Sequence, residues 1–243
     1  MKKTRTRLFA SEAGKEQLIL SDPDSLGVQR SLRLKTGQHI ACFNGDGMEY
    51  YYLINDSSRN NIFLSLKFSE PNISDQSSPV NIYIAATKGK TKDRIVRDLP
   101  PLGVSRIVFF KADRSVCLPQ VNALLRLRKI VIEACRQCGR STIPEIEIHL
   151  SSLSELCHDG CLDPAQSIVC WEHSDDCQAL LGHDSIGQDS ACNNLIFGPE
   201  GGFSDQEAEF IKSKPFTLAS LGKRILRTEL AVVVGMVLLS SAR

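Results

Sequence analysis

Strand patterns and helix patterns alternate along the chain from Val80 to the C-terminus. The strand patterns are short apolar runs, and the longer segments between them have apolar residues at helical spacing. This alternation predicts an α/β domain with a mainly parallel sheet. The expected strands are residues 80–87, 106–110, 145–150, 167–171, 194–197 and 216–221. The expected helices are residues 92–99, 119–138, 204–212 and 227–242.

The N-terminal part of the chain has a different pattern. Short alternating runs at residues 38–47, 49–56 and 61–68 are joined by turn residues, and no long helical period occurs. This pattern predicts a small β-barrel or sandwich. The polar stretch EPNISDQSSP (70–79) is the expected linker. We therefore expect two domains, residues 1–72 and residues 78–243.

The composition is that of an ordinary globular protein, with 42% hydrophobic and 23% charged residues. The apolar run AVVVGMVLL (231–239) is much shorter than the roughly 20 residues of a membrane span. The basic start MKKTRTRLFA is not followed by the apolar core of a signal peptide. We expect a cytoplasmic protein with no membrane partner.

Charge is strongly segregated along the chain, although the net charge is only +1. Residues 87–140 contain thirteen Lys and Arg and four acidic residues. Residues 141–210 contain fourteen acidic residues and no Lys or Arg. Blocks of one sign are typical of separate partner surfaces, and the basic blocks fit a polyanion such as RNA. The alternative is an arrangement that folding neutralises.

The nine cysteines favour reduced thiols over a disulfide framework, because their number is odd and the chain is neither short nor of secreted type. Cys135 and Cys138 form a CxxC, and Cys157 and Cys161 follow. Zinc prefers cysteine pairs on loops, whereas Cys135 ends a long helical pattern. Zinc therefore remains a minor alternative. The five histidines show no HxxxH spacing, so we expect no metal site.

The stretch NLIFGPEGGFSDQE (194–207) ends an apolar strand in Gly-Pro-Glu-Gly-Gly. Glycines at the carboxyl end of a strand let the backbone approach a ligand, and this is the usual ligand position in open α/β sheets. Ser204 and Glu207 form a capping-box pattern, which predicts a helix start directly afterwards. A tight turn without a ligand is the alternative.

Two other loops follow strand patterns. LASLGKRILRTELA (218–231) contains a Gly-Lys-Arg turn before the last helix, where Arg227 and Glu229 could also form a simple surface ion pair. TKGKTKD (87–93) is not a P-loop, because Ile84 stands where the first glycine is needed. Its lysines suit RNA phosphate instead.

At these motifs the chain resembles the SPOUT class of methyltransferases and, within it, the bacterial 16S rRNA (uracil-N3) methyltransferase family. The resemblance rests on LIFGPEGGFSDQE together with LGKRILRTE (221–229). It extends to EACRQCGRSTIPEI (133–146), QRSLRLKTGQHI (29–40) and TKGKTKD, and so covers nearly the whole chain.

The resemblance implies a PUA-like β-barrel followed by a parallel α/β domain with a C-terminal trefoil knot. It also implies a homodimer that binds S-adenosylmethionine and methylates N3 of a uridine in the 16S rRNA of the small ribosomal subunit. The cofactor would lie between the two glycine-containing loops. The implied cofactor-binding residues are Phe197, Gly198, Pro199, Glu200, Gly201, Gly202, Leu218, Ser220, Leu221, Gly222, Ile225 and Leu226.

The same resemblance suggests residues for catalysis and for RNA binding. N3 must lose a proton and charge develops at O2 or O4, so a base and a stabilising donor are needed. The catalytic candidates are Arg227, Glu229 and Glu200. The residues expected to hold rRNA phosphate are Arg5, Arg7, Arg30, Arg33, Lys35, Lys88, Lys90, Arg136 and Arg140.

The chain departs from the family pattern at Asp98, at Pro100-Pro101 and at Leu230. The proline pair predicts that the first helix of the second domain ends early. Two other functions stay open: a catalytically silent RNA-binding or assembly protein with the same fold, and a SPOUT enzyme acting on another RNA, such as a tRNA ribose.

Overall fold

A computed structural model of the chain describes residues 6–21, 34–58, 61–72, 79–171, 178–180 and 193–241. The chain forms two compact units. Residues 1–77 and 132–143 belong to unit 1, and residues 78–131 and 144–243 belong to unit 2. The sequence placed residues 132–143 with the second domain, whereas the structure groups them with the N-terminal unit.

Unit 1 contains a five-stranded sheet in the order β1-β3-β4-β5-β2. The β1–β3 pair is parallel and the other pairs are antiparallel. Alternate residues such as Ile40, Tyr52 and Leu64 form its buried core. The strands are β1 (Arg7–Phe9), β2 (Gln17–Leu20), β3 (His39–Phe43), β4 (Met48–Ser57) and β5 (Ile62–Pro71). The expected runs correspond to β3, β4 and β5.

Unit 2 contains a seven-stranded sheet in the order β10-β12-β9-β11-β6-β7-β8, with every neighbouring pair parallel. The parallel α/β prediction is therefore confirmed. The strands are β6 (Asn81–Ala85), β7 (Arg106–Phe110), β8 (Glu145–Ile148), β9 (Ser167–Cys170), β10 (Gln178–Ala179), β11 (Asn194–Phe197) and β12 (Thr217–Ser220).

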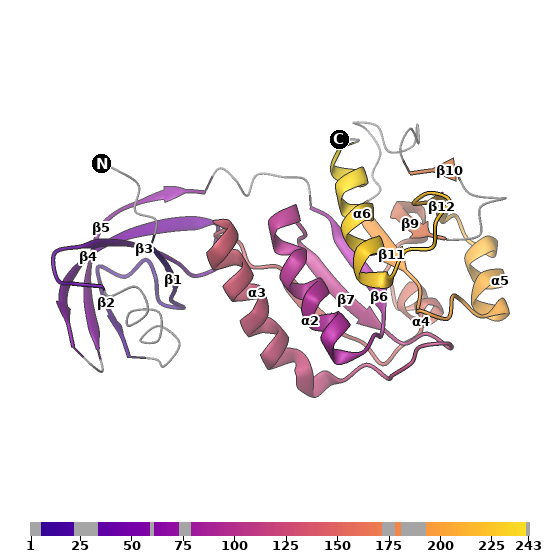
Figure 1. Cartoon of the computed structure of the whole chain (residues 1–243), viewed down its shortest axis with the longest axis horizontal. Coiled ribbons are helices and arrows are strands. Elements are labelled where there is room, and N and C mark those ends of the chain that lie inside the picture. The colour runs from indigo at the N-terminus through magenta and orange to yellow at the C-terminus, as the bar shows by residue number, and fades with distance from the viewer. Residues whose placement is uncertain are drawn as a thin grey trace. The chain divides into compact units, whose positions relative to one another are not determined.

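The two faces of this sheet are covered by different helices. The face with Val108 shares a core with Leu156 of α4 and Ile211 of α5. On the opposite face Phe197 packs on Gly235 of α6, and α6 lies beside α2 (Figure 1). The helices are α2 (Gly89–Asp98), α3 (Leu124–Cys138), α4 (Leu153–His158), α5 (Asp205–Ser213) and α6 (Thr228–Ser241). The unit boundary falls within α3, after Val131.

Local signals explain where several helices begin and end. The predicted capping box at Ser204 and Glu207 is present at the start of α5. A second one, Ser152 with Glu155, starts the short α4, which was not among the expected helices. As the proline pair predicts, α2 ends at Asp98, and residues 100–102 form a 3-10 turn.

Strand β11 has a central place in the second sheet. It pairs with β6 on one side and with β9 on the other, while β12 pairs with the far side of β9. All these strands are parallel, so their carboxyl ends meet at one edge of the sheet. The loops after β9, β11 and β12 therefore converge there, where ligands bind in open α/β sheets.

Candidate active site

A cavity of about 560 Å³ lies at this edge of unit 2. Its walls come from the loops after β9, β11 and β12, with further residues from α2, from the loop after β7 and from the start of α6. The lining residues are Thr91, Arg114, Cys170, Trp171, Phe197, Gly198, Pro199, Glu200, Gly201, Gly202, Phe203, Leu221, Gly222, Arg224, Ile225, Leu226, Arg227, Thr228, Glu229 and Ala231.

The loop after β11 contains glycines that the fold itself requires. A Cβ on Gly198 would lie 2.9 Å from the ring of Phe203, and one on Gly201 would lie 3.2 Å from Cβ of Arg114. Gly202 has a φ of 71°, in the left-handed region. Two of the three glycines therefore make room for the protein's own side chains, whereas the sequence had suggested that all three make room for a ligand.

The loop after β12 forms a second wall of the cavity. Gly222 has a φ of 117°, which an L side chain rarely adopts. Ser220 supports this turn, because its hydroxyl accepts a hydrogen bond from Gly222 N at 3.2 Å. Ser220 and Leu218 do not line the cavity, and Leu218 packs on the core beneath it. The other ten residues expected to bind the cofactor all line it.

The three catalytic candidates, Glu200, Arg227 and Glu229, also line the cavity. The Arg227 carbonyl accepts hydrogen bonds from the backbone of Leu230 and Ala231, so Arg227 stands immediately before α6 and Glu229 lies in its first turn. The Glu229 side chain is only 18% exposed, and its carboxylate lies 3.8 Å from Arg94 of α2. The amino end of a helix favours this negative charge.

Several lining residues were not expected from the sequence. Cys170 is the last residue of β9 and Trp171 follows it. No motif marks this strand, but its position between β11 and β12 brings both residues to the cavity. The Trp171 ring lies 5.4 Å from the Phe203 ring, centre to centre. The additional lining residues are Thr91, Arg114, Cys170, Trp171, Phe203, Arg224, Thr228 and Ala231. Five of them lie within the sequence motifs described above, and only the strand order could have identified the other three, Arg114, Cys170 and Trp171.

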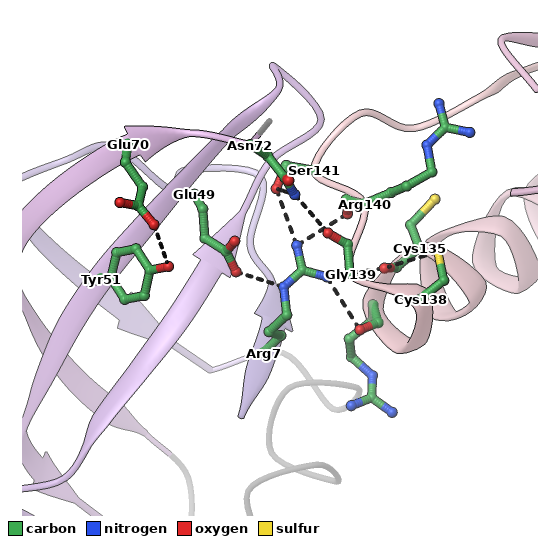
Figure 2. Close-up of polar contacts among 11 residues, drawn as sticks. Arg7, Glu49, Tyr51, Glu70, Asn72, Cys135, Cys138, Gly139, Arg140 and Ser141 are labelled. Carbon is green, nitrogen blue, oxygen red and sulfur yellow. Dashed lines mark hydrogen bonds and ion pairs between the residues drawn. The ribbon is translucent and has the colours of Figure 1, made fainter. Parts of the chain in front are cut away.

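Arg7 lies at the centre of a polar network inside unit 1 (Figure 2). Its Nε donates to Glu49 at 2.7 Å. Nη1 donates to the carbonyls of Cys135 and Arg136, and Nη2 to the Arg140 carbonyl and the Ser141 hydroxyl. A guanidinium has five N–H donors, so none is left for the RNA phosphate predicted at this residue. Arg7 instead satisfies carbonyls at the end of α3.

The other residues expected to bind RNA lie in both units. Lys88 and Lys90 are exposed at the start of α2 in unit 2, and Lys35 is exposed in unit 1. Arg136 pairs with Glu133, and Arg140 donates to the Thr142 hydroxyl at 2.9 Å. Arg5, Arg30 and Arg33 lie outside the described residues.

Cys135 and Cys138 lie in different environments. Cys135 is buried, with its thiol 3.6 Å from the Thr142 carbonyl, and Cys138 is exposed. Among the described residues, no group of three or more His, Cys, Asp or Glu could hold a metal ion. Within the same described residues, no helix has the length and apolar character of a membrane span.

Known proteins similar to this chain are RNA methyltransferases. Residues 74–240 match the RNA methyltransferase domain family. A ribosomal RNA small subunit methyltransferase E of Rickettsia conorii is 30% identical over 90% of this chain and 86% of its own length. A protein named ribosomal RNA small subunit methyltransferase E 2, from Borreliella burgdorferi, is 29% identical over 65% of this chain, but the match spans only 63% of that protein.

A solved structure has the same fold. It is a methyltransferase of Legionella pneumophila in complex with bound SAM, with a TM-score of 0.79, 24% identity and 98% coverage of both chains. The family match covers more than half of the present chain. The chain therefore belongs to the RNA methyltransferase domain family, among the proteins named ribosomal RNA small subunit methyltransferase E.

Proposed function

We propose that the protein methylates N3 of a uridine in the 16S rRNA of the small ribosomal subunit, with S-adenosylmethionine as the methyl donor. The observation that carries this proposal is the cavity in which both glycine-containing loops meet Arg227 and Glu229. The family membership and the names of the relatives support the substrate class. Such an enzyme would act in the cytoplasm, where ribosomal subunits assemble.

The residues at the cavity fit the proposed cofactor. Two loops with left-handed glycines, Gly202 and Gly222, present backbone N–H and C=O groups that can hydrogen-bond an adenine or an amino acid moiety. Leu221, Ile225 and Leu226 supply apolar contacts. Ile225 is 82% exposed in the single chain, so a ligand has apolar surface to cover. The Legionella structure contains SAM, which supports the same choice here.

When bound, S-adenosylmethionine supplies a methyl group that its sulfonium already activates. The protein then has to orient the uridine and remove the proton from its N3. In the proposed mechanism the Glu229 carboxylate accepts the proton from N3, and the Arg227 guanidinium stabilises the negative charge at O2 or O4. Arg94, at 3.8 Å, helps to keep Glu229 in place.

Two finer features of the fold belong to the same proposal. The chain runs through β7, β8 and β9 before β11 inserts between β6 and β9. This return to the middle of the sheet supports a C-terminal trefoil knot. The five-stranded sheet of unit 1 supports a PUA-like barrel, in which exposed Lys35 would meet rRNA phosphate.

We also propose that the protein is a homodimer. Helix α6 is apolar on all sides, as its sequence TELAVVVGMVLLSS shows. Leu230 and Val237 are two turns apart on one face and are 49% and 44% exposed in the single chain. A second copy would cover this face. Sedimentation should give a dimer for the wild type and a monomer for Leu230→Asp, and a wild-type monomer at micromolar concentration would contradict the proposal.

The enzyme assignment is tested by methyl transfer. Purified protein, labelled S-adenosylmethionine and small ribosomal subunits that lack the modification are incubated together, and the product nucleoside is identified by mass spectrometry. We expect N3-methyluridine, with turnover reduced at least a hundredfold in Glu229→Gln. A 2′-O-methylated nucleoside would favour the SPOUT enzyme with another substrate. Rapid RNA binding without any methyl transfer would favour the silent RNA-binding protein.

A further inference from the structure

The loop after β7 brings a residue to the cavity that belongs to neither glycine-containing loop. This residue is Arg114, in the segment KADRS (111–115). Strand β7 lies two positions from β11 in the sheet, so its loop approaches the cavity from the side of β6. The mechanism described above gives Arg114 no role.

Polar contacts fasten this loop to the start of α5. Asp113 N donates to Glu207 Oε1 at 3.1 Å, and the Ser204 hydroxyl donates to Asp113 Oδ2 at 2.6 Å. Ser204 and Glu207 are the capping box of α5. One pair of side chains therefore caps the helix and holds Asp113, so the position of the next residue, Arg114, is fixed by its neighbour.

The Arg114 side chain is itself held against the wall of the cavity. Its Cβ lies 3.2 Å from the position that a Cβ on Gly201 would occupy, so the stem packs on the Gly201 backbone. Its Nη1 donates to the Phe203 carbonyl at 3.1 Å. Both contacts place the guanidinium beside the glycine loop before any ligand arrives.

The guanidinium still has capacity to bind. The Arg114 side chain is 49% exposed, and its ion partner Asp205 is fully exposed at 3.6 Å, which is a weak and solvent-screened contact. Among the described residues no hydrogen bond uses Arg114 Nε. Three arginines and two glutamates line the cavity, so its charge favours an anion.

We propose that Arg114 binds the backbone phosphate of the target nucleotide and so orients the uridine in the cavity. This inference rests on the proposed function, because it assumes an RNA substrate. The planar fork of a guanidinium suits the paired oxygens of a phosphate. RNA phosphate displaces Asp205 and keeps the contact with the Phe203 carbonyl. The methionine carboxylate of the cofactor is the competing ligand, and the test distinguishes the two.

The test measures RNA affinity and cofactor affinity separately. The full-length protein is titrated with small-subunit rRNA at several KCl concentrations by filter binding, and with S-adenosylmethionine by calorimetry. Loss of one phosphate contact should reduce the slope of log K against log salt by about 0.7–0.9. For Arg114→Gln we expect this smaller slope, about tenfold weaker RNA binding at low salt, and an S-adenosylmethionine Kd within about twofold of the wild type.

Two further variants separate a phosphate contact from a structural effect. Arg114→Lys keeps the positive charge and should restore the wild-type slope with part of the affinity. Arg128→Gln makes the same charge change at an exposed position of α3 that does not line the cavity. If Arg128→Gln changes the slope as much as Arg114→Gln does, the proposal is wrong.

Two further outcomes also test the proposed role of Arg114. An unchanged RNA slope with a much weaker S-adenosylmethionine affinity in Arg114→Gln would assign the residue to the cofactor and overturn the proposal. RNA affinity is measured without turnover. A protein that binds RNA but transfers no methyl group would therefore refute the proposed function, while its salt slopes would still show whether Arg114 contacts phosphate.

Discussion

The α-carbon of Gly235 on α6 faces the ring of Phe197 at the end of β11. A Cβ at Gly235 would lie 2.8 Å from Cζ of Phe197, closer than real Cβ atoms approach other atoms. Phe197 is only 3% exposed, so its ring has little room to move. The last helix can therefore lie on the strand that precedes the Gly-Pro-Glu-Gly-Gly turn only because residue 235 has no side chain.

This contact predicts that Gly235→Ala is destabilising. Alanine is better than glycine within a helix by about 1 kcal/mol, but overpacking a buried site costs about 1–3 kcal/mol. We expect the second effect to dominate, with a lower Tm and weaker S-adenosylmethionine binding, because Phe197 moves together with the turn. Gly89→Ala is the control, since a Cβ there meets nothing within 4 Å and should not lower the Tm. An unchanged Tm for Gly235→Ala would show that the ring can move aside.

Gly222→Ala should weaken cofactor binding through strain. A Cβ on Gly222 would meet nothing within 4 Å, so no clash is expected, but the φ of 117° is unfavourable for alanine. The loop after β12 must then change its backbone, which we expect to raise the S-adenosylmethionine Kd about tenfold or more, as measured by calorimetry. The effect on Tm should be small, because the loop is exposed. Wild-type affinity in this variant would mean that the loop does not hold the cofactor.

The features that the sequence predicted correctly are those whose signals lie in neighbouring residues. The strand at residues 194–197 and the capping box at Ser204 were both readable, because each signal lies within a few positions. The same box at Ser152 starts a helix of only six residues, which is too short to show a helical period in the sequence. Nothing local shows that Arg7 reaches carbonyls 128 or more residues away. The glycines were correctly singled out, but the Phe203 ring and the Arg114 stem that require them could not be predicted without the fold.

Lys92 should destabilise the protein at neutral pH. The side chain is on α2, and the residue is only 2% exposed, with its ammonium 5.2 Å from the centre of the Phe109 ring. Burial lowers the pKa of Lys92, and the nearby Cys117 only partly opposes this effect. The folded state thus binds the Lys92 proton more weakly than the unfolded state does. The free energy of unfolding therefore falls as the pH drops below the ordinary lysine pKa, and it remains reduced at lower pH.

We therefore expect Lys92→Met to be more stable than the wild type at pH 7, by about 1–3 kcal/mol. The lost cation–π contact is worth about 0.5–2 kcal/mol and reduces this gain. Chemical denaturation at pH 7 and at pH 10 measures the effect, which should shrink at the higher pH. A less stable Lys92→Met at both pH values would mean that the ammonium is well satisfied in the fold.

Glu147 should contribute to stability against acid. Burial raises the pKa of Glu147, but hydrogen bonds from Arg106 and His149 outweigh burial, so the pKa is lowered overall. Arg106 Nη2 donates to Glu147 at 2.6 Å, and His149 Nε2 lies 2.7 Å from the same carboxylate. A lowered pKa stabilises the fold above the ordinary glutamate pKa, and this stabilisation is lost as the pH falls through the folded value.

Glu147→Gln should consequently lower the free energy of unfolding at pH 7 by about 1 kcal/mol, and should flatten its decline below about pH 5. Urea denaturation from pH 7 to pH 3 measures both effects. Glu145→Gln, on the same strand but exposed and without a hydrogen bond to Arg106, is the matched control. Parallel pH curves for the wild type and Glu147→Gln would contradict the assigned role.

Arg7→Met should strongly destabilise unit 1. The side chains of Arg7 and Glu49 are only 10% and 15% exposed, so removing the guanidinium leaves a carboxylate almost buried without its partner. It also removes the Arg7 donor from the Arg136 carbonyl, whereas the Cys135 carbonyl keeps the backbone donors Gly139 N and Arg140 N. Breaking such a pair costs about 3–5 kcal/mol. Arg7→Lys should recover only part of this stability, because an ammonium has three donors where the guanidinium makes five bonds.

The same variant distinguishes a structural Arg7 from one that binds RNA. If the network is correct, the loss of stability in Arg7→Met is large even without RNA, and Glu49→Gln, which keeps a neutral acceptor for the arginine, costs less. Thermal and urea denaturation of the full chain measure both variants. The opposite result would be a free energy of unfolding for Arg7→Met within about 1 kcal/mol of the wild type, together with weaker and less salt-dependent rRNA binding. It would show that Arg7 binds RNA. The five bonds of its guanidinium argue for the structural outcome.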